Sequence, residues 1–490
     1  MPQVNNSDLL LLGPVIVLTV FALLVILMES FTLGKRRDFI MRLAVLGGIS
    51  AFATSIYFYL QLEGLDRQFL FNGMLVADKT SMIFATLFSA VAIMVSLTAA
   101  GHQRTYNWEN GKFYGLLLLA CAGMTILAMA ADLVIVFIGV ETMSIATYVL
   151  VALQRRSRRS SEAAMKYFLM GAFASGFLLY GMALCFGATG TTSLQGIRQA
   201  LTTTNSEALL IVGVFMLIIG FGFKVAAFPF HMWAPDVYEG APTPVTGFMA
   251  AAVKAGAFAG IVRVFIDGFG GEVFPLGKMG WVGIFAGLAA VTMTVGNIAA
   301  LKQRNVKRML AYSSVSHAGF LLISVVSMGL SGASTASVSL LYYLVVYSMT
   351  TLGVFGVMAW VSGKERERVL VNDWAGVAQK HPVMALAMTI FLLSLAGMPP
   401  TGGFVGKFLV LKDAMEAQGG QLIWLVVVGV VNSMISIFYY LRVIMAMYFR
   451  DPVGDLEECR SFGQTTVVFF SVVVVLLMGI LPGLWIGLLS

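Results

Sequence analysis

The sequence predicts an all-α polytopic membrane protein. Hydrophobic residues make up 59% of the 490 positions, whereas Asp, Glu, Lys and Arg together make up only 11%. A soluble domain carries about 25% charged residues, so this composition excludes the soluble classes. About fourteen apolar segments are long enough, at about 1.5 Å per residue, to cross a hydrocarbon core ~30 Å thick. The alternating strands of a membrane barrel would be only about ten residues long.

The expected membrane segments can be placed in order along the chain. They cover approximately residues 9–29, 39–61, 75–99, 112–130, 132–153, 162–188, 208–229, 242–268, 279–300, 304–330, 333–362, 381–416, 421–449 and 464–489. The first is expected to be a retained helix, because a secretory signal begins with basic residues and none precede this segment. The junction near Ala131 and Asp132 leaves almost no connection between two segments.

Basic residues are distributed unequally between the connections. Those after odd-numbered segments hold most of the Lys and Arg, including four arginines within residues 155–159. The other connections hold only Arg67, Arg198, Arg263 and Lys278. Cytoplasmic loops carry the excess of Lys and Arg in membrane proteins, so the first set is predicted to face the cytoplasm and both termini the outside. The net charge of +7 therefore reflects topology rather than nucleic-acid binding.

The sequence contains no recognisable metal or nucleotide motif. The three cysteines, Cys121, Cys185 and Cys459, have no C-x-x-C or C-x-x-H spacing. No phosphate-binding loop of the G-x-x-x-x-G-K-[ST] type and no dinucleotide-binding glycine fingerprint occurs. No cofactor is therefore expected in this chain, and ATP-driven transport by the chain alone is disfavoured.

Five ionisable residues lie deep within predicted segments: Glu141, Lys224, Lys254, His317 and Lys407. Each such charge costs about 2.5–3.5 kcal/mol to insert, and charges of this kind mark substrate or proton pathways. The alternatives are a buried acid holding a helix contact for Glu141, a satisfied core histidine for His317, and lysines at helix ends whose amines reach water.

Two further candidates are weaker. Lys166 lies early in its segment, where its amine could reach water, and His231 lies in a stretch expected at the membrane interface. Neither position needs a polar path through the membrane to explain its charge.

Helix-breaking residues accompany two of the deep lysines. Pro229 follows "GFGFK", which ends at Lys224, while Pro399, Pro400, Gly402 and Gly403 lie in or just before "GFVGK", which ends at Lys407. Paired interrupted helices point to a transport site, and their unpaired backbone groups require a cavity or polar partners.

These residues also suggest a chemistry. A buried lysine loses its proton more readily than one in water, whereas a nearby carboxylate favours the charged form. If Glu141 approaches and leaves Lys224, that lysine can accept and release a proton near neutral pH. No deep carboxylate near Lys407 is evident, so its partner is expected on an adjacent subunit.

Several stretches resemble the antiporter-like membrane subunits of respiratory complex I. They are "KYFLMGAFASGFLLYGMAL", "FGFKVAAFPFHMWAPDVYEGAPTPVTGFMAAAVKAGAF", "KRMLAYSSVSHAGFLLI" and "GMPPTGGFVGKF", and "FHMWAPDVYEGAPTPV" is most similar to the N branch rather than the L and M branches. The resemblance covers nearly the whole chain. The stretch "VETMSIATYVL" departs from the leucine- and proline-rich run expected there, without affecting the glutamate.

The resemblance implies an architecture. It implies fourteen helices with two inverted five-helix repeats, each containing a broken helix. The expected divisions are an N-terminal three-helix segment (1–111), a first repeat (112–268), a second repeat (279–449) and a C-terminal helix (464–490).

It also implies roles for individual residues. Glu141 and Lys224 match the family's glutamate–lysine pair, and Lys254 matches its central lysine. Lys407 matches the lysine of the second broken helix, and His317 matches the conducting histidine. Lys166 and His231 match family positions as well.

The implied function is proton translocation driven by quinone reduction elsewhere in the complex. NADH, FMN, iron–sulfur clusters and quinone are expected in other subunits, with K-type and M-type membrane subunits as neighbours in a bacterial inner membrane. Two alternatives remain open: a subunit of a sodium/proton antiporter or membrane-bound hydrogenase, and a non-conducting scaffold. Deep lysines repel sodium and favour protons.

Overall fold

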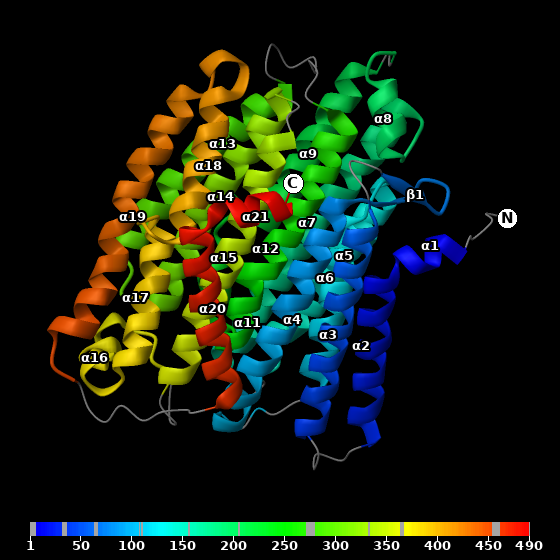
Figure 1. Ribbon diagram of the computed structural model, residues 1–490. Coiled ribbons are helices and arrows are strands. Elements are labelled where there is room, and N and C mark those ends of the chain that lie inside the picture. Colours follow the sequence, from blue (N-terminus) through cyan, green and yellow to red (C-terminus); the bar gives the residue numbers. More distant parts are fainter. Residues whose placement is uncertain are drawn as a thin grey trace.

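Helices packed side by side form an elongated bundle with a small hairpin at its edge (Figure 1). The structure is a computed structural model that describes residues 6–31, 37–62, 67–106, 108, 111–154, 157–203, 206–270, 280–331, 334–362, 367–452 and 461–489. Arg155, Arg156, Lys278 and Cys459, named above, lie outside the described residues.

Within the described chain, 12 helices are long and apolar enough to cross a membrane, which confirms the helical membrane class. They are α2 (Gly13–Phe31), α3 (Arg37–Gln61), α4 (Lys79–Thr105), α6 (Leu133–Val151), α7 (Arg158–Thr189), α9 (Glu207–Val225), the stretch Thr243–Phe269, α13 (Gly280–Leu301), α14 (Val306–Ser331), α15 (Ser334–Val361), α19 (Ile423–Phe449) and α20 (Phe462–Ile480). Shorter apolar helices are α5 (Lys112–Ala128) and α17 (Pro382–Ala396). The remaining helices are α1 (Asn6–Leu11), α8 (Leu194–Ala200), α10 (Trp233–Gly240), α16 (Val377–Lys380), α18 (Gly402–Glu416), α21 (Pro482–Leu489), and the 3-10 turns η3 (Val371–Trp374) and η4 (Ala417–Gly420).

The helical bundle also carries one small β element, so the segment expected at 75–99 begins as a strand rather than as a helix. Strands β1 (Gln68–Leu70) and β2 (Leu75–Ala77) form an antiparallel hairpin before α4. Phe71, Asn72 and Gly73 in its turn all have positive φ. Asn-Gly favours such hairpin turns, so the sequence does carry a signal for this element.

The short connection near Ala131 is long enough to join two membrane helices. Helix α5 ends at Ala128 and α6 begins at Leu133. The Asp132 carboxylate accepts a hydrogen bond from the Val134 amide at 2.8 Å, which caps α6. Two antiparallel spans can therefore follow each other across four residues.

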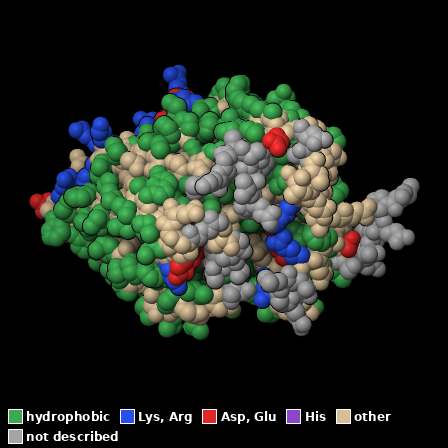
Figure 2. All heavy atoms as spheres, turned by 90° about the horizontal axis from the view of Figure 1, so that it is seen from above, with side chains coloured by type: hydrophobic (Ala, Val, Ile, Leu, Met, Phe, Trp, Pro, Cys, Tyr) green, Lys and Arg blue, Asp and Glu red, His purple; other side chains and the backbone are tan. Residues whose placement is uncertain are grey.

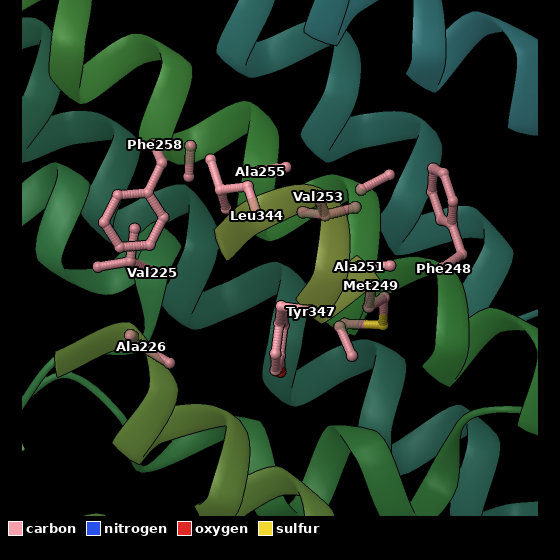
Figure 3. Packing of buried hydrophobic residues seen from close by; sticks show 14 of the residues in the cluster. Val225, Ala226, Phe248, Met249, Ala251, Val253, Ala255, Phe258, Leu344 and Tyr347 are labelled. Carbon is pink, nitrogen blue, oxygen red and sulfur yellow. The ribbon is translucent and has the colours of Figure 1, made fainter. Parts of the chain in front are cut away.

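Three buried helical stretches form the centre of the bundle: Thr243–Phe269, α14 and α15. The first of them consists of α11 (Thr243–Phe248), the π-helical turn η1 (Met249–Val253), α12 (Lys254–Ile261) and a second π-helical turn, η2 (Val262–Phe269). Figure 3 shows Tyr347 of α15 beside the η1 segment, and Phe258 of α12 beside Val225 at the end of α9. Such π-turns change which way the following side chains point and are frequent at functional sites.

Two apolar stretches are interrupted. The segment expected at 381–416 consists of two helices, α17 and α18, separated by residues 397–401, which include Pro399 and Pro400. Helix α9 ends at Val225, and α10 begins at Trp233, so Pro229 lies in the gap between them. In both gaps the residue that ends the first helix is left-handed, with φ of 59° at Ala226 and 82° at Gly397.

Arg263 was counted above among the basic residues of the connections, but it does not lie in a loop. It lies in η2 and is only 2% exposed. Its guanidinium holds both carboxylate oxygens of Asp78 at 2.6 and 2.8 Å and donates to Asp267 at 2.9 Å. Burial alone would raise the pKa of the Asp78 carboxyl, but the neighbouring Arg263 charge lowers it.

Figure 2 views the end of the bundle that carries α8, where charged side chains form small separate groups among uncharged ones.

Candidate functional site

Lys224 reaches across the bundle from the last turn of α9 to α6. Its amine donates to the Ser144 hydroxyl at 2.7 Å and approaches the Tyr148 hydroxyl at 3.4 Å. The lysine side chain is 5% exposed, and the amine also lies 5.8 Å from the centre of the Tyr148 ring. The polar partners of this buried ammonium are therefore neutral hydroxyls.

Glu141 lies on the same helix as these hydroxyls, three residues before Ser144 and seven before Tyr148. Residues at these spacings share one helix face. The Glu141 carboxylate accepts a hydrogen bond from Ser175 of α7. No ion pair shorter than 4.0 Å joins Glu141 to Lys224 in the described part of the chain, so Ser144 connects the lysine to the helix face on which the acid lies.

Lys254 is the first residue after the π-helical turn η1, at the centre of the molecule. It is 3% exposed, and its amine donates to both the carbonyl and the hydroxyl oxygen of Ser314 on α14. The Tyr238 hydroxyl lies 3.4 Å from the hydroxyl oxygen of Ser314. The Tyr347 ring centre lies 5.7 Å from the Lys254 amine. Ser314 thus joins α10, α12 and α14 through polar groups.

His317 contacts a tyrosine hydroxyl at each ring nitrogen. Its Nδ1 lies 2.6 Å from the Tyr343 hydroxyl and its Nε2 lies 3.2 Å from the Tyr440 hydroxyl. The Tyr440 hydroxyl also contacts Ser313. Because a neutral imidazole donates at one nitrogen and accepts at the other, His317 can pass a proton between the two tyrosines by changing tautomer. The Tyr347 ring, which faces Lys254, is centred 5.0 Å from the His317 ring.

Lys407 finds its partners at the end of the preceding helix. Its amine donates to the carbonyls of Leu395 and Ala396 at 2.9 and 3.1 Å, and lies 5.0 Å from the centre of the Phe320 ring. These carbonyls end α17, and a helix C-terminus stabilises a positive charge. The lysine, expected to need a partner on another subunit, therefore has neutral partners within its own chain.

A close helix approach makes this contact possible. A Cβ atom on Gly403 would lie 1.9 Å from the carbonyl oxygen of Ser394. Only glycine therefore lets the start of α18 lie against the end of α17, which brings Lys407 within reach of the exposed carbonyls.

Lys166 and His231 lie apart from these contacts. Lys166 is 43% exposed and forms ion pairs with Glu162 and Asp236 at 2.8 and 2.9 Å. His231 is half-buried, with its ring beside that of Phe228 and next to the backbone of Pro229. Within the described part of the chain, no hydrogen bond or ion pair joins either side chain to the four buried candidates Lys224, Lys254, His317 and Lys407.

Sequence reasoning missed most of the hydroxyl groups at the site: Ser144, Tyr148, Tyr238, Ser314, Tyr343 and Tyr440. Ser313, which contacts Tyr440, lies four residues before His317 on α14. The others come from different helices, and hydroxyls in apolar segments also commonly bond to the backbone of their own helix.

The chain is similar to proteins of known classes over nearly its whole length. Residues 130–436 match the family described as NADH:quinone oxidoreductase/Mrp antiporter, TM. An NADH-quinone oxidoreductase subunit N from Trichlorobacter lovleyi is 40% identical over 483 residues, covering 98% of this chain and 95% of that protein. One from Gemmatimonas aurantiaca is 46% identical over 397 residues, covering 80% and 74%.

Solved structures give the same picture. A chain of respiratory complex I from Thermus thermophilus, solved with bound Aureothin, matches with a TM-score of 0.81 and 31% identity, covering 97% of this chain and 99% of that one. A chain of the Mrp complex from Dietzia sp. has a TM-score of 0.81 at 19% identity, covering 96% and 95%. At that identity the second likeness concerns the fold alone.

Proposed function

The chain belongs to the subunit N family of NADH-quinone oxidoreductases, the antiporter-like membrane subunits of respiratory complex I, and we propose that it carries protons through its line of buried lysine, histidine and hydroxyl groups. In this proposal Glu141 and Lys224 form the first exchanging pair, Lys254 the central site, and His317 and Lys407 the later sites. The chain is a non-redox subunit of the enzyme, and NADH oxidation drives the transfer from elsewhere in the complex.

One observation carries the proposal. Lys224, Lys254 and Lys407 are each at most 5% exposed, and their amines bind neutral oxygens. A buried ammonium without a counter-charge is costly, so a fold retains three of them where their charge has a use. Neutral hydroxyls can both donate and accept, which suits proton exchange better than a fixed ion pair does.

The proposed architecture follows the family. The 12 long apolar helices of the described chain become fourteen membrane crossings if α5 is counted as one more crossing and α17 and α18 together as another. The proposed divisions are residues 1–111, a first repeat at 112–268, a second at 279–449 and a last helix at 464–490, with the α9–α10 and α17–α18 gaps as the two broken helices.

The proposed setting is a bacterial inner membrane, with both termini on the outer side. Two contacts support a common side for the termini: the Tyr59 hydroxyl donates to the Leu488 carbonyl at 2.6 Å, and the Phe71 amide donates to Asp8 at 3.3 Å. Both contacts lie beside the hairpin end of α3. We further propose K-type and M-type subunits as neighbours, with NADH, FMN, iron–sulfur clusters and quinone bound by other subunits.

Replacement of Lys224 by alanine in the whole complex tests the proposal. NADH-driven proton pumping is measured in vesicles, with assembly checked on native gels. We expect normal assembly with strongly reduced pumping. Lys412→Ala is the matched control, because Lys412 also lies on a membrane helix but is exposed and paired with Glu416 at 3.8 Å. Equal pumping by both variants refutes the role of Lys224.

A sodium/proton antiporter is the second candidate, favoured by the shared fold of the Mrp complex. It predicts pumping that depends on sodium concentration. The lysines of the site oppose it, since three buried cationic side chains repel a sodium ion. A non-conducting scaffold instead predicts unchanged pumping in all variants of the buried lysines.

A further inference from the structure

A buried cluster of charged groups lies outside the proposed relay, where α4, α14 and the segment after α15 meet. His102 of α4 and Lys307 of α14 are 0% and 1% exposed, and both contact the Glu367 carboxylate. His102 Nε2 lies 2.7 Å from Glu367 Oε1, while Lys307 forms an ion pair with the other oxygen. The cluster therefore joins three separate parts of the chain.

The tautomer of His102 is specified by its neighbours. The Trp108 indole, which can only donate, lies 3.1 Å from His102 Nδ1. Nδ1 must therefore accept, and the ring proton is on Nε2, where it is donated to Glu367. Burial favours the neutral acid, but the Lys307 ammonium and the His102 hydrogen bond lower the pKa of Glu367 well below its usual range. Glu367 thus acts as a fixed anion rather than a proton carrier.

The same cluster holds the turn between α10 and α11. The Lys307 amine donates to the Ala241 carbonyl at 3.0 Å, and the Thr243 amide approaches Glu367 Oε1 at 3.4 Å. A cavity of about 400 Å³ lies against this turn and is lined by Glu239, Gly240, Ala241 and Glu367 among others. Tyr238, just before the turn, contacts Ser314, which binds Lys254. The turn therefore has the cavity beside it and begins three residues after Tyr238, the tyrosine that contacts the Ser314 partner of Lys254.

We propose that Glu367 is a positioning residue that clamps the α10–α11 turn shut and so controls water access from this cavity to Tyr238, Ser314 and Lys254. His102 fixes the direction of the carboxylate, and Lys307 couples it to the turn. A backbone hydrogen bond also holds the segment that carries Glu367 against α14, since the Val306 amide donates to the Val369 carbonyl at 2.6 Å. Loss of the carboxylate frees the turn without removing any group of the relay. This inference rests on the proposed role of Lys254.

The closure can be measured by reactivity at Thr243, which is 1% exposed and lies directly at Glu367. A cysteine is introduced there in a Cys459→Ser background, and the buried Cys121 and Cys185 are kept. The complex in lipid nanodiscs is treated with a charged, membrane-impermeant maleimide. Glu367→Ala is expected to raise the labelling rate at least about tenfold, the factor expected when one hydrogen bond that holds a site closed is lost.

Glu239→Gln is the matched control, because Glu239 lines the same cavity but binds Arg308 and Asn305. Labelling in this control should equal that of the parent. Trp108→Phe, which removes only the indole donor to His102, should raise labelling as well and decides the test if Glu367→Ala fails to assemble. Labelling at the parent rate in the assembled variants overturns the clamp.

A second measurement separates access from general loosening. In proteoliposomes under an imposed potential, Glu367→Ala should increase passive proton leak, and adding Lys254→Ala should return the leak to the parent value. A leak that persists without Lys254 overturns the proposed connection to the central lysine. The maleimide result stands whether or not Lys254 carries protons, so failure of the clamp and failure of the proposed function remain distinguishable.

Discussion

Tyr440→Phe is expected to slow proton pumping, because it removes the hydroxyl between His317 and Ser313. That hydroxyl lies 3.2 Å from His317 Nε2, on the side of the ring opposite Tyr343. Phenylalanine keeps the ring and its packing, so the change is confined to one oxygen atom.

The magnitude follows from comparison with a second buried tyrosine. Tyr342 and Tyr440 are 0% and 1% exposed, but the Tyr342 hydroxyl donates to the Met478 carbonyl. Either Tyr→Phe change leaves buried partners unsatisfied, at about 1–3 kcal/mol of folding stability. Only Tyr440→Phe also interrupts the contact with His317. An added barrier of ~1.4 kcal/mol slows a step about tenfold, and we expect at least this decrease.

The assay is NADH-driven acidification of vesicles containing the whole complex, with the amount of assembled complex measured in parallel. Tyr342→Phe serves as the control and should pump within about twofold of the parent once normalised to assembled complex. Equal losses in the two variants would mean that the effect is structural. Normal pumping by Tyr440→Phe would refute the tyrosine–histidine path.

Three further predictions follow from single contacts. Gly403→Ala places a Cβ 1.9 Å from the Ser394 carbonyl and should cost about 1–3 kcal/mol or more, measured as lost assembled complex, whereas Gly176→Ala has no atom within 4 Å and should assemble normally. Lys166→Ala removes only exposed ion pairs, which contribute little to stability, and should leave pumping within about twofold; a large loss would place Lys166 in the relay. Because the pKa of Glu367 is lowered, its stabilising effect is complete above about pH 4.3 and is lost only as pH falls through the lower folded value. The labelling rate at position 243, divided by the rate of a free thiol in solution at the same pH because only the thiolate reacts, should therefore be constant from about pH 5 to 8, and a rise in this ratio at about pH 5 would contradict the fixed anion.

Much of the fold could be predicted because insertion into a bilayer is governed by length and composition. Both features are written locally in the sequence. The hairpin at residues 68–77 was missed because its strands are three residues long, too short for an alternating pattern to show. The burial of Arg263 was missed because its two acidic partners, Asp78 and Asp267, stabilise a charge that the sequence alone would place in water.

The candidate site was only partly predictable. An ionisable residue in an apolar segment is conspicuous in a sequence, and this was enough to single out Lys224, Lys254 and Lys407. Their partners are not conspicuous, because serine, tyrosine and backbone carbonyls occur in every helix. Which of these groups faces a given lysine depends on helix packing, and for Lys254 also on the π-helical turn that precedes it.

The two G-F-x-x-K motifs show how packing changes the meaning of a sequence pattern. Lys224 precedes its helix break and lies in the last turn of α9. Lys407 follows its break, yet its amine turns back to the last carbonyls of α17. Both lysines are therefore associated with the C-terminal end of the helix before the break, Lys224 as a residue of its last turn and Lys407 through its amine, and a helix C-terminus stabilises a nearby cation by roughly 0.3–1 kcal/mol or more. The Lys224 amine also contacts Ser144, on the helix face that carries Glu141, whereas the polar partners of Lys407 are the two carbonyls. The carboxylate is thus the part of the first site that the second lacks, and the charge on Glu141 can change the protonation of Lys224 without changing that of Lys407 in the same way.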